Sequence, residues 1–417
     1  MRPDCAAHDR RDTTDERYIA AYERRRTVLR MTHSATRRIV IDARNRSGAA
    51  ARHLLGLSVL RRMIRAARRS GFGNIVVLAG ADEIDRLRPV IIDEAAVMIV
   101  SAVPALQNST VTARVPADLV GERSWLEQLA TERAPSGTRR SEGADIFLFN
   151  VEATPEQIAA ADIASAGEPI IFQTPPLRMA GESDRKPAEQ RLLKGLIKNS
   201  DGFMSRYFAR PISIGLSWRL APHGVTPNQM TIVSTLVGLA AAPFFLSASP
   251  AVQVIGGLLF VAHSVLDGCD GELARLTFRE SRLGGLLDFF SDNLVHVAIF
   301  TCMAVGWSLV EGASWPLFLG ALAVLGTAGS AGAVYWLTLR NKTTAGPVYT
   351  SVSDGPSGRL TKVLDALSRR DFIYLVLVLS AFGKANWFLA LTAVGAPVFL
   401  FLVLWTAHRD AQRRHAV

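Results

Sequence analysis

The chain has 417 residues, of which 49% are hydrophobic and 20% are charged, and its formal net charge is +10. This length has room for two or three domains, and the charge suits nucleic acid, an anionic membrane surface or a phosphorylated substrate. The cations do not form a stripe interleaved with aromatic residues, so nucleic acid is excluded as the expected partner. Cysteines occur at three positions without metal-ligand spacing, which excludes a disulfide framework: Cys5, Cys269 and Cys302.

The apolar residues are unevenly spread along the chain. Up to about residue 228 the sequence is charged and rich in arginine, and after it long apolar runs dominate. We therefore expect a soluble part followed by a membrane part. Residues 1–35 have no apolar core of the signal-peptide kind and are expected to form a mobile tail, with a true start at Met31 as an alternative.

Residues 36–190 are expected to form an α/β domain with a mainly parallel sheet. Buried strands are predicted at Arg38–Ala43 and Asn74–Ala79, with a helix at Ser58–Ser70 between them. Further apolar runs are expected to add strands at Ala95–Val100, Ile146–Phe149 and Ile170–Phe172. Strands that alternate with helices are typical of a parallel sheet.

The opening of this domain, Ile39 to Gly80, resembles the start of the sugar-phosphate nucleotidyltransferases. That family carries a glycine-rich loop ending in arginine, then a lysine, and later a metal-binding aspartate. Here the loop from Arg44 to Arg52 has one glycine, no lysine follows it, and no aspartate occurs near Phe149–Glu152. The resemblance implies the same fold, and these departures from the family pattern predict that nucleotidyl transfer has been lost. Three arginines are then expected to form a solvated basic loop: Arg44, Arg46 and Arg52. An active N-terminal cytidylyltransferase is the alternative.

Residues 191–228 are expected to form a linker and then an amphipathic helix in the membrane interface. Asp201 to Pro222 carries five apolar residues along one side and three cations among them. The apolar residues are Phe203, Tyr207, Ile212, Leu216 and Leu220, and the cations are Arg206, Arg210 and Arg219. The alternative is a surface helix packed on the soluble domain.

Residues 229–410 are expected to form an all-α domain with six transmembrane helices. The predicted spans are 229–248, 251–270, 285–308, 314–338, 371–384 and 386–407, and the fifth is short for a helix that crosses a bilayer. Cations gather between spans two and three, between spans four and five, and after span six: Arg275, Arg279, Arg282, Arg340, Lys342, Arg359, Lys362, Arg369, Arg370, Arg409, Arg413 and Arg414. The positive-inside rule predicts that both termini and this side of the domain face the cytoplasm, in the plasma or inner membrane.

Four aspartates lie at the boundary between spans two and three. Asp267 and Asp270 are three residues apart and share one helix face, and Asp288 and Asp292 are four apart and share another. A carboxylate inside a membrane span costs roughly 2.5–3.5 kcal/mol, so four of them require compensation. Converging carboxylates suit Mg²⁺ or Mn²⁺, with room for two ions.

The aspartates belong to a longer pattern, Asp-x2-Asp-Gly-x2-Ala-Arg-x8-Gly-x3-Asp-x3-Asp. It is filled by Asp267, Asp270, Gly271, Ala274, Arg275, Gly284, Asp288 and Asp292. This pattern resembles the signature of the CDP-alcohol phosphotransferase family, over about residues 198–410.

The resemblance implies a metal-dependent transfer of a phosphoalcohol group from a CDP-alcohol to an acceptor alcohol, with release of CMP. It also implies that the four aspartates are metal ligands, with Asp292 as the alternative general base. Gly271, Ala274, Arg275 and Gly284 would line the nucleotide pocket.

Residues outside the pattern carry weaker expectations. Arg206, Arg210 and Arg282 are candidates for binding the phosphate of a phosphorylated acceptor. His263 and His296 flank the aspartates and are expected to be packed or interfacial residues rather than metal ligands.

The substrates are left open between two donors. A nucleotidyltransferase-like domain ahead of this membrane domain resembles the bifunctional inositol-phosphate cytidylyltransferase/di-inositol-phosphate-phosphate synthase arrangement, which implies CDP-inositol as donor and a phosphorylated polyol as acceptor. CDP-diacylglycerol is the rival donor and would require an apolar groove beside the aspartates. A non-catalytic membrane anchor is the alternative from a different functional class, and the complete aspartate pattern argues against it. The quaternary state is left open, with a homodimer as one option.

Overall fold

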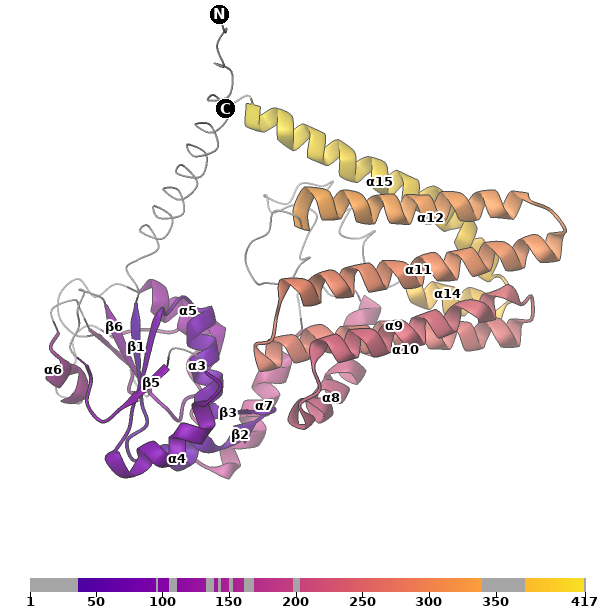
Figure 1. Ribbon diagram of the computed structural model, residues 1–417. Helices are drawn as coiled ribbons and strands as arrows, with labels where there is room; N and C mark the ends of the chain where they lie inside the picture. The colour runs from indigo at the N-terminus through magenta and orange to yellow at the C-terminus, as the bar shows by residue number, and fades with distance from the viewer. Residues whose placement is uncertain are drawn as a thin grey trace, which may run out of the picture. The chain divides into compact units, whose positions relative to one another are not determined.

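Figure 1 shows the computed structural model of the chain, which forms two compact units, Met1–Ala188 and Glu189–Val417. The structure describes residues 37–94, 97–104, 111–132, 139–141, 144–149, 153–160, 169–197, 203–339 and 372–415. The expected tail at 1–35 and the predicted loop cations from Arg340 to Arg370 lie outside these residues, as do the side chains of Arg409, Arg413 and Arg414.

The first unit contains a mainly parallel sheet, which confirms the fold class expected from the sequence. Its strand order is β5-β4-β1-β6-β8-β7, and the central pairs β1·β4, β1·β6 and β4·β5 are parallel. The short strands β8 and β7 add to one edge in antiparallel orientation. The strands are β1 (Arg38–Asp42), β4 (Asn74–Leu78), β5 (Val97–Val100), β6 (Thr112–Pro116), β7 (Arg139–Arg140) and β8 (Phe147–Phe149), and a separate hairpin consists of β2 (His53–Leu54) and β3 (Leu57–Ser58).

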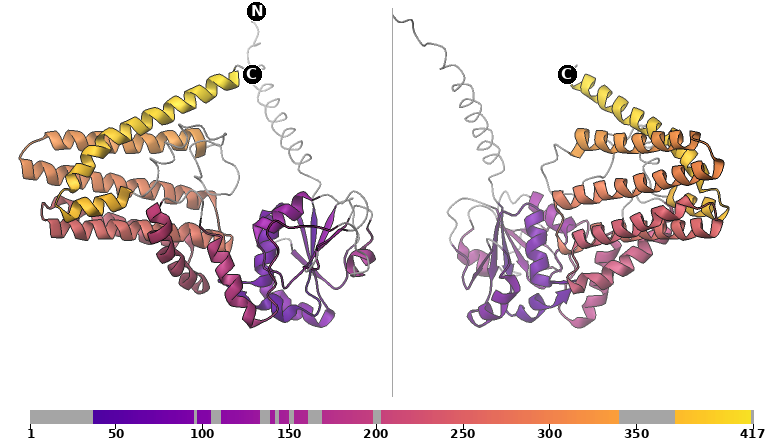
Figure 2. Two further views of the ribbon diagram at one scale, coloured as in Figure 1. Left: turned by 180° about the vertical axis from the view of Figure 1, so that it is seen from behind. Right: turned by 45° about the vertical axis from the view of Figure 1, so that its right-hand side comes forward.

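Helices cover both faces of this sheet (Figures 1 and 2). Val40 and Phe147 pack with Ile158 on the face that α6 covers. Because side chains alternate along a strand, Ile39 and Ile41 point to the opposite face, where α3 and α5 lie. The helices are α2 (Ser47–Ala51), α3 (Val59–Arg69), α4 (Ala81–Ile91), α5 (Arg123–Thr131) and α6 (Pro155–Ala160).

The strand predicted at Ile170–Phe172 is wrong. Only Pro169 forms a bridge, with Arg140, and the side chain of Ile171 is 80% exposed. Proline has no backbone N–H to donate, and the neighbouring strand β7 is two residues long, so a ladder does not continue past Pro169.

The arginine-rich loop after β1 is not the solvated loop expected from the sequence. Arg44 and Arg114 both donate to the buried carboxylate of Asp42, and Arg46 pairs with Asp118 at 3.6 Å. Arg52 donates to the carbonyl of Ala180. These arginines are therefore held by acids and carbonyls of their own domain, at the edge of the sheet where ligands of parallel α/β folds bind.

The second unit is helical (Figure 2). Its described residues include five helices long and apolar enough to cross a membrane. Five of the six predicted transmembrane spans are thus confirmed. The predicted segment 371–384 corresponds to α14 (Phe372–Ala381), whose ten described residues are too few to cross a bilayer. The long helices are α9 (Pro227–Ala241, continued by η5, Ala242–Leu246), α10 (Pro250–Thr277), α11 (Arg282–Glu311), α12 (Trp315–Val334, continued by η6, Tyr335–Leu339) and α15 (Ala385–His415). These helices indicate an integral membrane protein.

Small residues let these helices approach closely. A Cβ added to Gly320 of α12 would clash with the Cβ of Ala304 in α11. One added to Gly326 would lie 2.8 Å from the backbone of Ala396 in α15. Such contacts are typical of helix packing in membranes, where lipid tails are as apolar as leucine.

A shorter helix precedes the spans. After α7 (Arg185–Lys194), the π-helical turn η3 (Ser205–Ala209) leads into α8 (Arg210–Leu220), which packs on α10. Ser213 and Ser217 face that contact and are buried, while Phe203 and Tyr207 are 70% and 67% exposed. Exposed aromatic residues just ahead of α8 suit a segment in the membrane interface, and the interfacial helix stays a prediction.

Candidate active site

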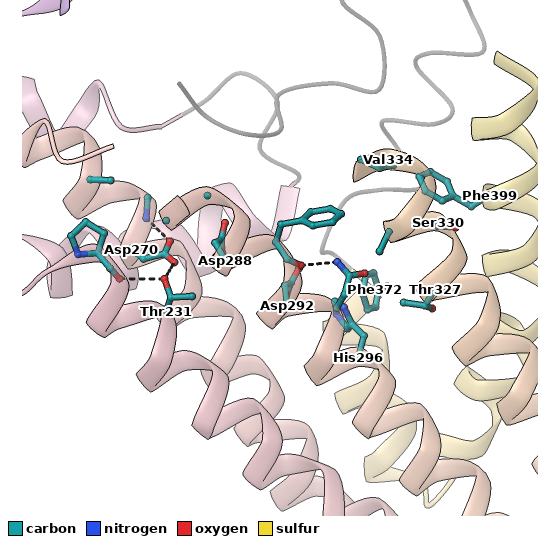
Figure 3. Close-up of a pocket in the computed structure, with 18 of the residues that line it drawn as sticks. Thr231, Asp270, Asp288, Asp292, His296, Thr327, Ser330, Val334, Phe372 and Phe399 are labelled. Atoms are coloured by element: carbon teal, nitrogen blue, oxygen red, sulfur yellow. Dashed lines mark hydrogen bonds between the residues drawn. The ribbon is translucent and has the colours of Figure 1, made fainter. Parts of the chain in front are cut away.

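Four aspartates converge where α10 ends and α11 begins. Helix α10 stops at Phe278, whose left-handed backbone (φ 55°) turns the chain, and α11 starts after Ser281, whose hydroxyl accepts from the amide of Gly284. Figure 3 shows Asp270, Asp288 and Asp292 along one side of the same pocket. The turn therefore places both predicted carboxylate pairs at one site.

Ligand atoms in this cluster form two groups close enough to hold a metal ion. One oxygen each from Asp267, Asp270 and Asp288 lie within 4.8 Å of one another, and so do atoms of His263, Asp267 and Asp292. Asp267 belongs to both groups and is 3% exposed. Carboxylate oxygens at this spacing, two of the aspartates buried and two half-buried, fit a divalent cation.

Asp270 is held by a residue of α9 that the sequence analysis did not identify. The hydroxyl of Thr231 donates to Asp270 Oδ2 at 2.5 Å (Figure 3). Thr231 lies one turn inside α9, which Thr226 caps by accepting from the amide of Gln229. Its role depends on the packing of α9 against α10, which no local pattern reveals.

The residues predicted to bind the nucleotide line one end of a cavity of about 640 Å³: Gly271, Ala274, Arg275 and Gly284. A Cβ added to Gly284 would lie 3.0 Å from Asn228 Oδ1, and one added to Gly271 would lie 3.2 Å from Arg275 Nη1. The two glycines thus leave space where side chains would crowd Asn228 and Arg275. Asn228 and Arg279 also line this end and were not predicted as site residues.

The other end of the cavity is apolar and runs between α11, α12, α14 and α15. Its lining includes Phe300, Val334, Phe372, Phe388 and Phe399, with three hydroxyl groups among them, from Thr327, Ser330 and Thr392. One continuous cavity therefore joins the carboxylates to an apolar channel among membrane helices.

The arginines predicted to bind an acceptor phosphate do not line this cavity. Arg206, Arg210 and Arg282 are all absent from its lining. Arg210 Nη1 instead donates to Glu272 Oε1 at 2.8 Å, in a contact where the Glu272 side chain is fully buried. The hydroxyls of Ser213 and Ser217 donate to the same carboxylate, each at 2.7 Å.

Glu272 was missed although the sequence offered two signals. It stands directly after Gly271 within the aspartate pattern, and Arg210, Ser213 and Ser217 follow a helical spacing on the polar side of α8. Because α8 supplies all three donors, it is anchored to the turn of α10 that carries Gly271 and Arg275.

The two histidines differ in their surroundings. His263 is 1% exposed, and its Nε2 lies 3.4 Å from Asp292 Oδ1. His296 packs among the rings of Phe260, Phe300 and Phe372 and lines the cavity.

The segment that holds this site is similar to known proteins. Residues 224–396 match the family model described as CDP-alcohol phosphatidyltransferase. A bifunctional IPC transferase and DIPP synthase from Thermococcus kodakarensis is 38% identical over 143 residues, which are 34% of this chain and 31% of that protein. An archaetidylinositol phosphate synthase from Pyrococcus horikoshii is 38% identical over 87 residues, which are 21% of this chain and 45% of that protein.

The matched segments thus cover less than half the length of either curated relative. The crystal structure of a phosphatidylinositol phosphate synthase from Mycobacterium tuberculosis with CDP-DAG bound matches with a TM-score of 0.35 and 17% sequence identity, covering 48% of this chain and 93% of that one.

Proposed function

We propose that the chain moves a phosphoalcohol group from a lipid-linked CDP-alcohol to a polar acceptor alcohol, with release of CMP, because residues 224–396 match the CDP-alcohol phosphatidyltransferase family model. The observation that carries this proposal is the continuous cavity. Its polar end holds Asp270, Asp288 and Asp292, and its apolar end lies among α11, α12 and α15.

The polar end supports binding of the cytidine diphosphate. Gly271 and Gly284 leave room for the nucleotide, and Ala274 keeps the adjacent helical turn small. Arg275 and Arg279 present guanidinium groups to this space, and a guanidinium pairs with two phosphate oxygens at once.

The carboxylates fit a divalent cation by their chemistry and spacing. Asp267, Asp270, Asp288 and Asp292 would hold Mg²⁺ or Mn²⁺, and the two ligand groups that share Asp267 support a pair of ions. A bound cation would neutralise charge on the diphosphate.

Asp292 is the proposed general base. Its carboxylate lines the cavity, so it can take the proton from the acceptor hydroxyl as that oxygen attacks the β-phosphorus. The new phosphorus–oxygen bond forms while the bond from the β-phosphorus to the bridging oxygen breaks. CMP leaves with the α-phosphate, and Asp292 passes its proton to solvent.

The apolar end of the cavity favours a donor with a hydrocarbon tail, of the CDP-diacylglycerol kind. A channel lined mainly by apolar residues such as Phe300, Phe388 and Phe399 solvates an acyl chain, whereas the polyol of a soluble donor would lose more hydration there than three hydroxyl groups replace. CDP-inositol is the second candidate, favoured by the Thermococcus kodakarensis relative that is named a bifunctional IPC transferase and DIPP synthase. For the acceptor we propose a phosphorylated polyol. Arg279 lines the cavity and is the proposed ligand of the acceptor phosphate, in place of the three arginines predicted from the sequence.

The N-terminal domain is proposed to be inactive in nucleotidyl transfer. Asp42 at the end of β1 is already occupied by Arg44 and Arg114, which leaves this carboxylate no free face for a metal-bound nucleotide. The alternatives are a bifunctional enzyme and a non-catalytic anchor.

We further propose that the termini and the site face the cytoplasm, which Arg275, Arg279 and Arg282 near the α10–α11 turn support. We also propose that the chain forms a homodimer, which cross-linking in native membranes would test.

The test is CMP release by the purified protein with Mg²⁺ or Mn²⁺, over a panel that crosses CDP-diacylglycerol and CDP-inositol with phosphorylated and unphosphorylated polyols. We expect release with the lipid donor. Asp292→Asn should reduce it to background, since loss of a general base costs roughly 10²–10⁴ in rate. Glu311→Gln, at the far end of the same helix α11, is the matched control and should keep full activity. Release only with CDP-inositol would refute the lipid donor, and no release with any pair would revive the anchor.

A further inference from the structure

One buried histidine, His263, directs a ring nitrogen toward the carboxylates, within ion-pair distance of Asp292. His263 is one helical turn before Asp267 on α10, so both side chains lie on the same face. Its Nδ1 lies 2.8 Å from the carbonyl oxygen of Ser234 in α9. A carbonyl only accepts, so Nδ1 carries the proton, and in the neutral ring Nε2 presents its lone pair.

That lone pair is directed at the aspartates. His263 Nε2 has no hydrogen-bond partner, although the residue is 1% exposed. Its separation from Asp292 Oδ1 is 3.4 Å, which is longer than the roughly 2.7–3.2 Å of an N–H···O hydrogen bond. Two arrangements account for a buried nitrogen in this position: a protonated ring paired with Asp292, or a metal ion bound between Nε2 and the carboxylates.

The spacing fits a shared ion. Two ligand atoms that each lie about 2.1 Å from one metal are about 3.0 Å apart in adjacent positions and about 4.2 Å apart in opposite ones. The separation of 3.4 Å falls inside this interval, and one ligand atom each from His263, Asp267 and Asp292 lie within 4.8 Å of one another.

The surroundings fix the ring in this position. The ring of Phe260 lies parallel to the imidazole within 4°, with centroids 6.1 Å apart. Across the helix interface, a Cβ added to Gly238 of α9 would come within 2.9 Å of His263 Cγ and 2.6 Å of Val295 Cγ1. The absence of a side chain at Gly238 therefore creates the space that the imidazole occupies.

We infer that His263 is a nitrogen ligand to the deeper of the two proposed metal ions, together with Asp267 and Asp292. An imidazole ligand favours Mn²⁺ and other transition metals, whereas Mg²⁺ prefers oxygen. The membrane site is thus one all-oxygen group of Asp267, Asp270 and Asp288 beside one mixed nitrogen–oxygen group. This inference rests on the proposed function only for the presence of a divalent cation.

The experiment uses the full-length protein in detergent, stripped of metal and loaded with Mn²⁺ alone, without substrates. Pulsed electron paramagnetic resonance should detect a nitrogen coupling to Mn²⁺ in the wild type and lose it in His263→Gln. His296→Gln removes the neighbouring histidine and should keep the coupling. Size-exclusion profiles and thermal unfolding verify that both variants fold, and His263→Asn serves as a smaller replacement if glutamine perturbs packing.

Metal affinity gives a second, independent readout. In His263→Gln the Kd for Mn²⁺ should rise more than about tenfold, since even loss of an outer partner of a ligand costs about 10–100-fold. The Kd for Mg²⁺, measured by competition, should rise less. No nitrogen coupling in the wild type, a coupling that survives in His263→Gln, or an equal loss of both metals would overturn the inference. Since no substrate is present, a wrong choice of donor cannot produce any of these results.

Discussion

The clamp between α8 and α10, formed by Arg210, Ser213, Ser217 and Glu272, allows a sharp energetic prediction. Arg210→Ala removes the guanidinium and leaves the Glu272 carboxylate, which is fully buried, with two hydroxyl donors only. At 2.8 Å and an effective dielectric constant of about 20, the lost attraction is roughly 6 kcal/mol before solvation is counted.

The net loss of stability should be smaller than that attraction. Removing one partner of a buried ion pair typically costs about 3–5 kcal/mol. Here the Ser213 and Ser217 hydroxyls remain and offset part of the cost, so we expect about 3 kcal/mol. For a unit of this size the loss corresponds to a fall in Tm of about 6–12 °C.

The assay is thermal unfolding of the purified protein in detergent, followed by tryptophan fluorescence. Arg219→Ala, on the exposed side of the same helix α8, is the matched control and should leave Tm within about 2 °C, because surface charges contribute little. The double variant Arg210→Ala/Glu272→Gln should recover most of the loss, since the neutral amide can accept from one serine hydroxyl through its oxygen and donate to the other through its NH2 group. Equal Tm values for Arg210→Ala and Arg219→Ala, or no recovery in the double variant, would refute the clamp.

Two further predictions concern the apolar channel and the N-terminal domain. Gly395→Leu fills open space in the lining of the channel and should lower CMP release with a long-chain donor more than with a short-chain one. Gly332→Leu is the control, because a Cβ added there also meets open space but lies outside the lining, and it should affect both donors equally. Equal effects of Gly395→Leu on the two donors would contradict a channel for the lipid tail. Burial alone would raise the pKa of Asp42, but hydrogen bonds and charges from its arginine partners hold it below the usual value, so this carboxylate stabilises the fold above about pH 4 and loses that contribution as the pH falls further. Asp42→Asn should therefore cost about 3 kcal/mol of unfolding free energy at neutral pH and weaken the acid dependence of unfolding. The control Asp93→Asn, at an exposed position, should change stability by less than about 1 kcal/mol. Equal unfolding profiles for Asp42→Asn and the wild type from pH 3 to 7 would contradict this interpretation.

The features that the sequence predicted are those whose information is local. The spacings of Asp267 to Asp270 and of Asp288 to Asp292 depend only on helical periodicity, so both pairs could be placed on facing helices. The parallel sheet followed in the same way from apolar runs that alternate with a helix. The strand expected at Ile170–Phe172 failed because pairing at a sheet edge depends on the partner strand, which the run itself does not specify.

What the sequence could not supply are partners that meet only in the fold. Arg44 was read as a solvated residue, and its aspartate lies two positions away on the buried end of β1. Arg210 was read as a phosphate ligand, since nothing in α8 alone reveals that Glu272 is buried against it. His263 shows i to i+4 spacing with Asp267, but this spacing is equally common for packed residues, and only the carbonyl of Ser234 fixes its tautomer.

Charge balance distinguishes the two carboxylate sites. In the N-terminal domain, Asp42 lies between two arginines, so its charge is balanced within the chain. Among the described residues that line the membrane cavity there are four acids, Asp270, Glu280, Asp288 and Asp292, against two arginines, Arg275 and Arg279, and Asp267 lies behind them. One divalent cation would leave this region about one charge negative and would repel a diphosphate, whereas two would leave it positive and attract one. The excess of acids thus supports two proposed ions, and it gives the membrane domain a reason to keep carboxylates that a bilayer disfavours.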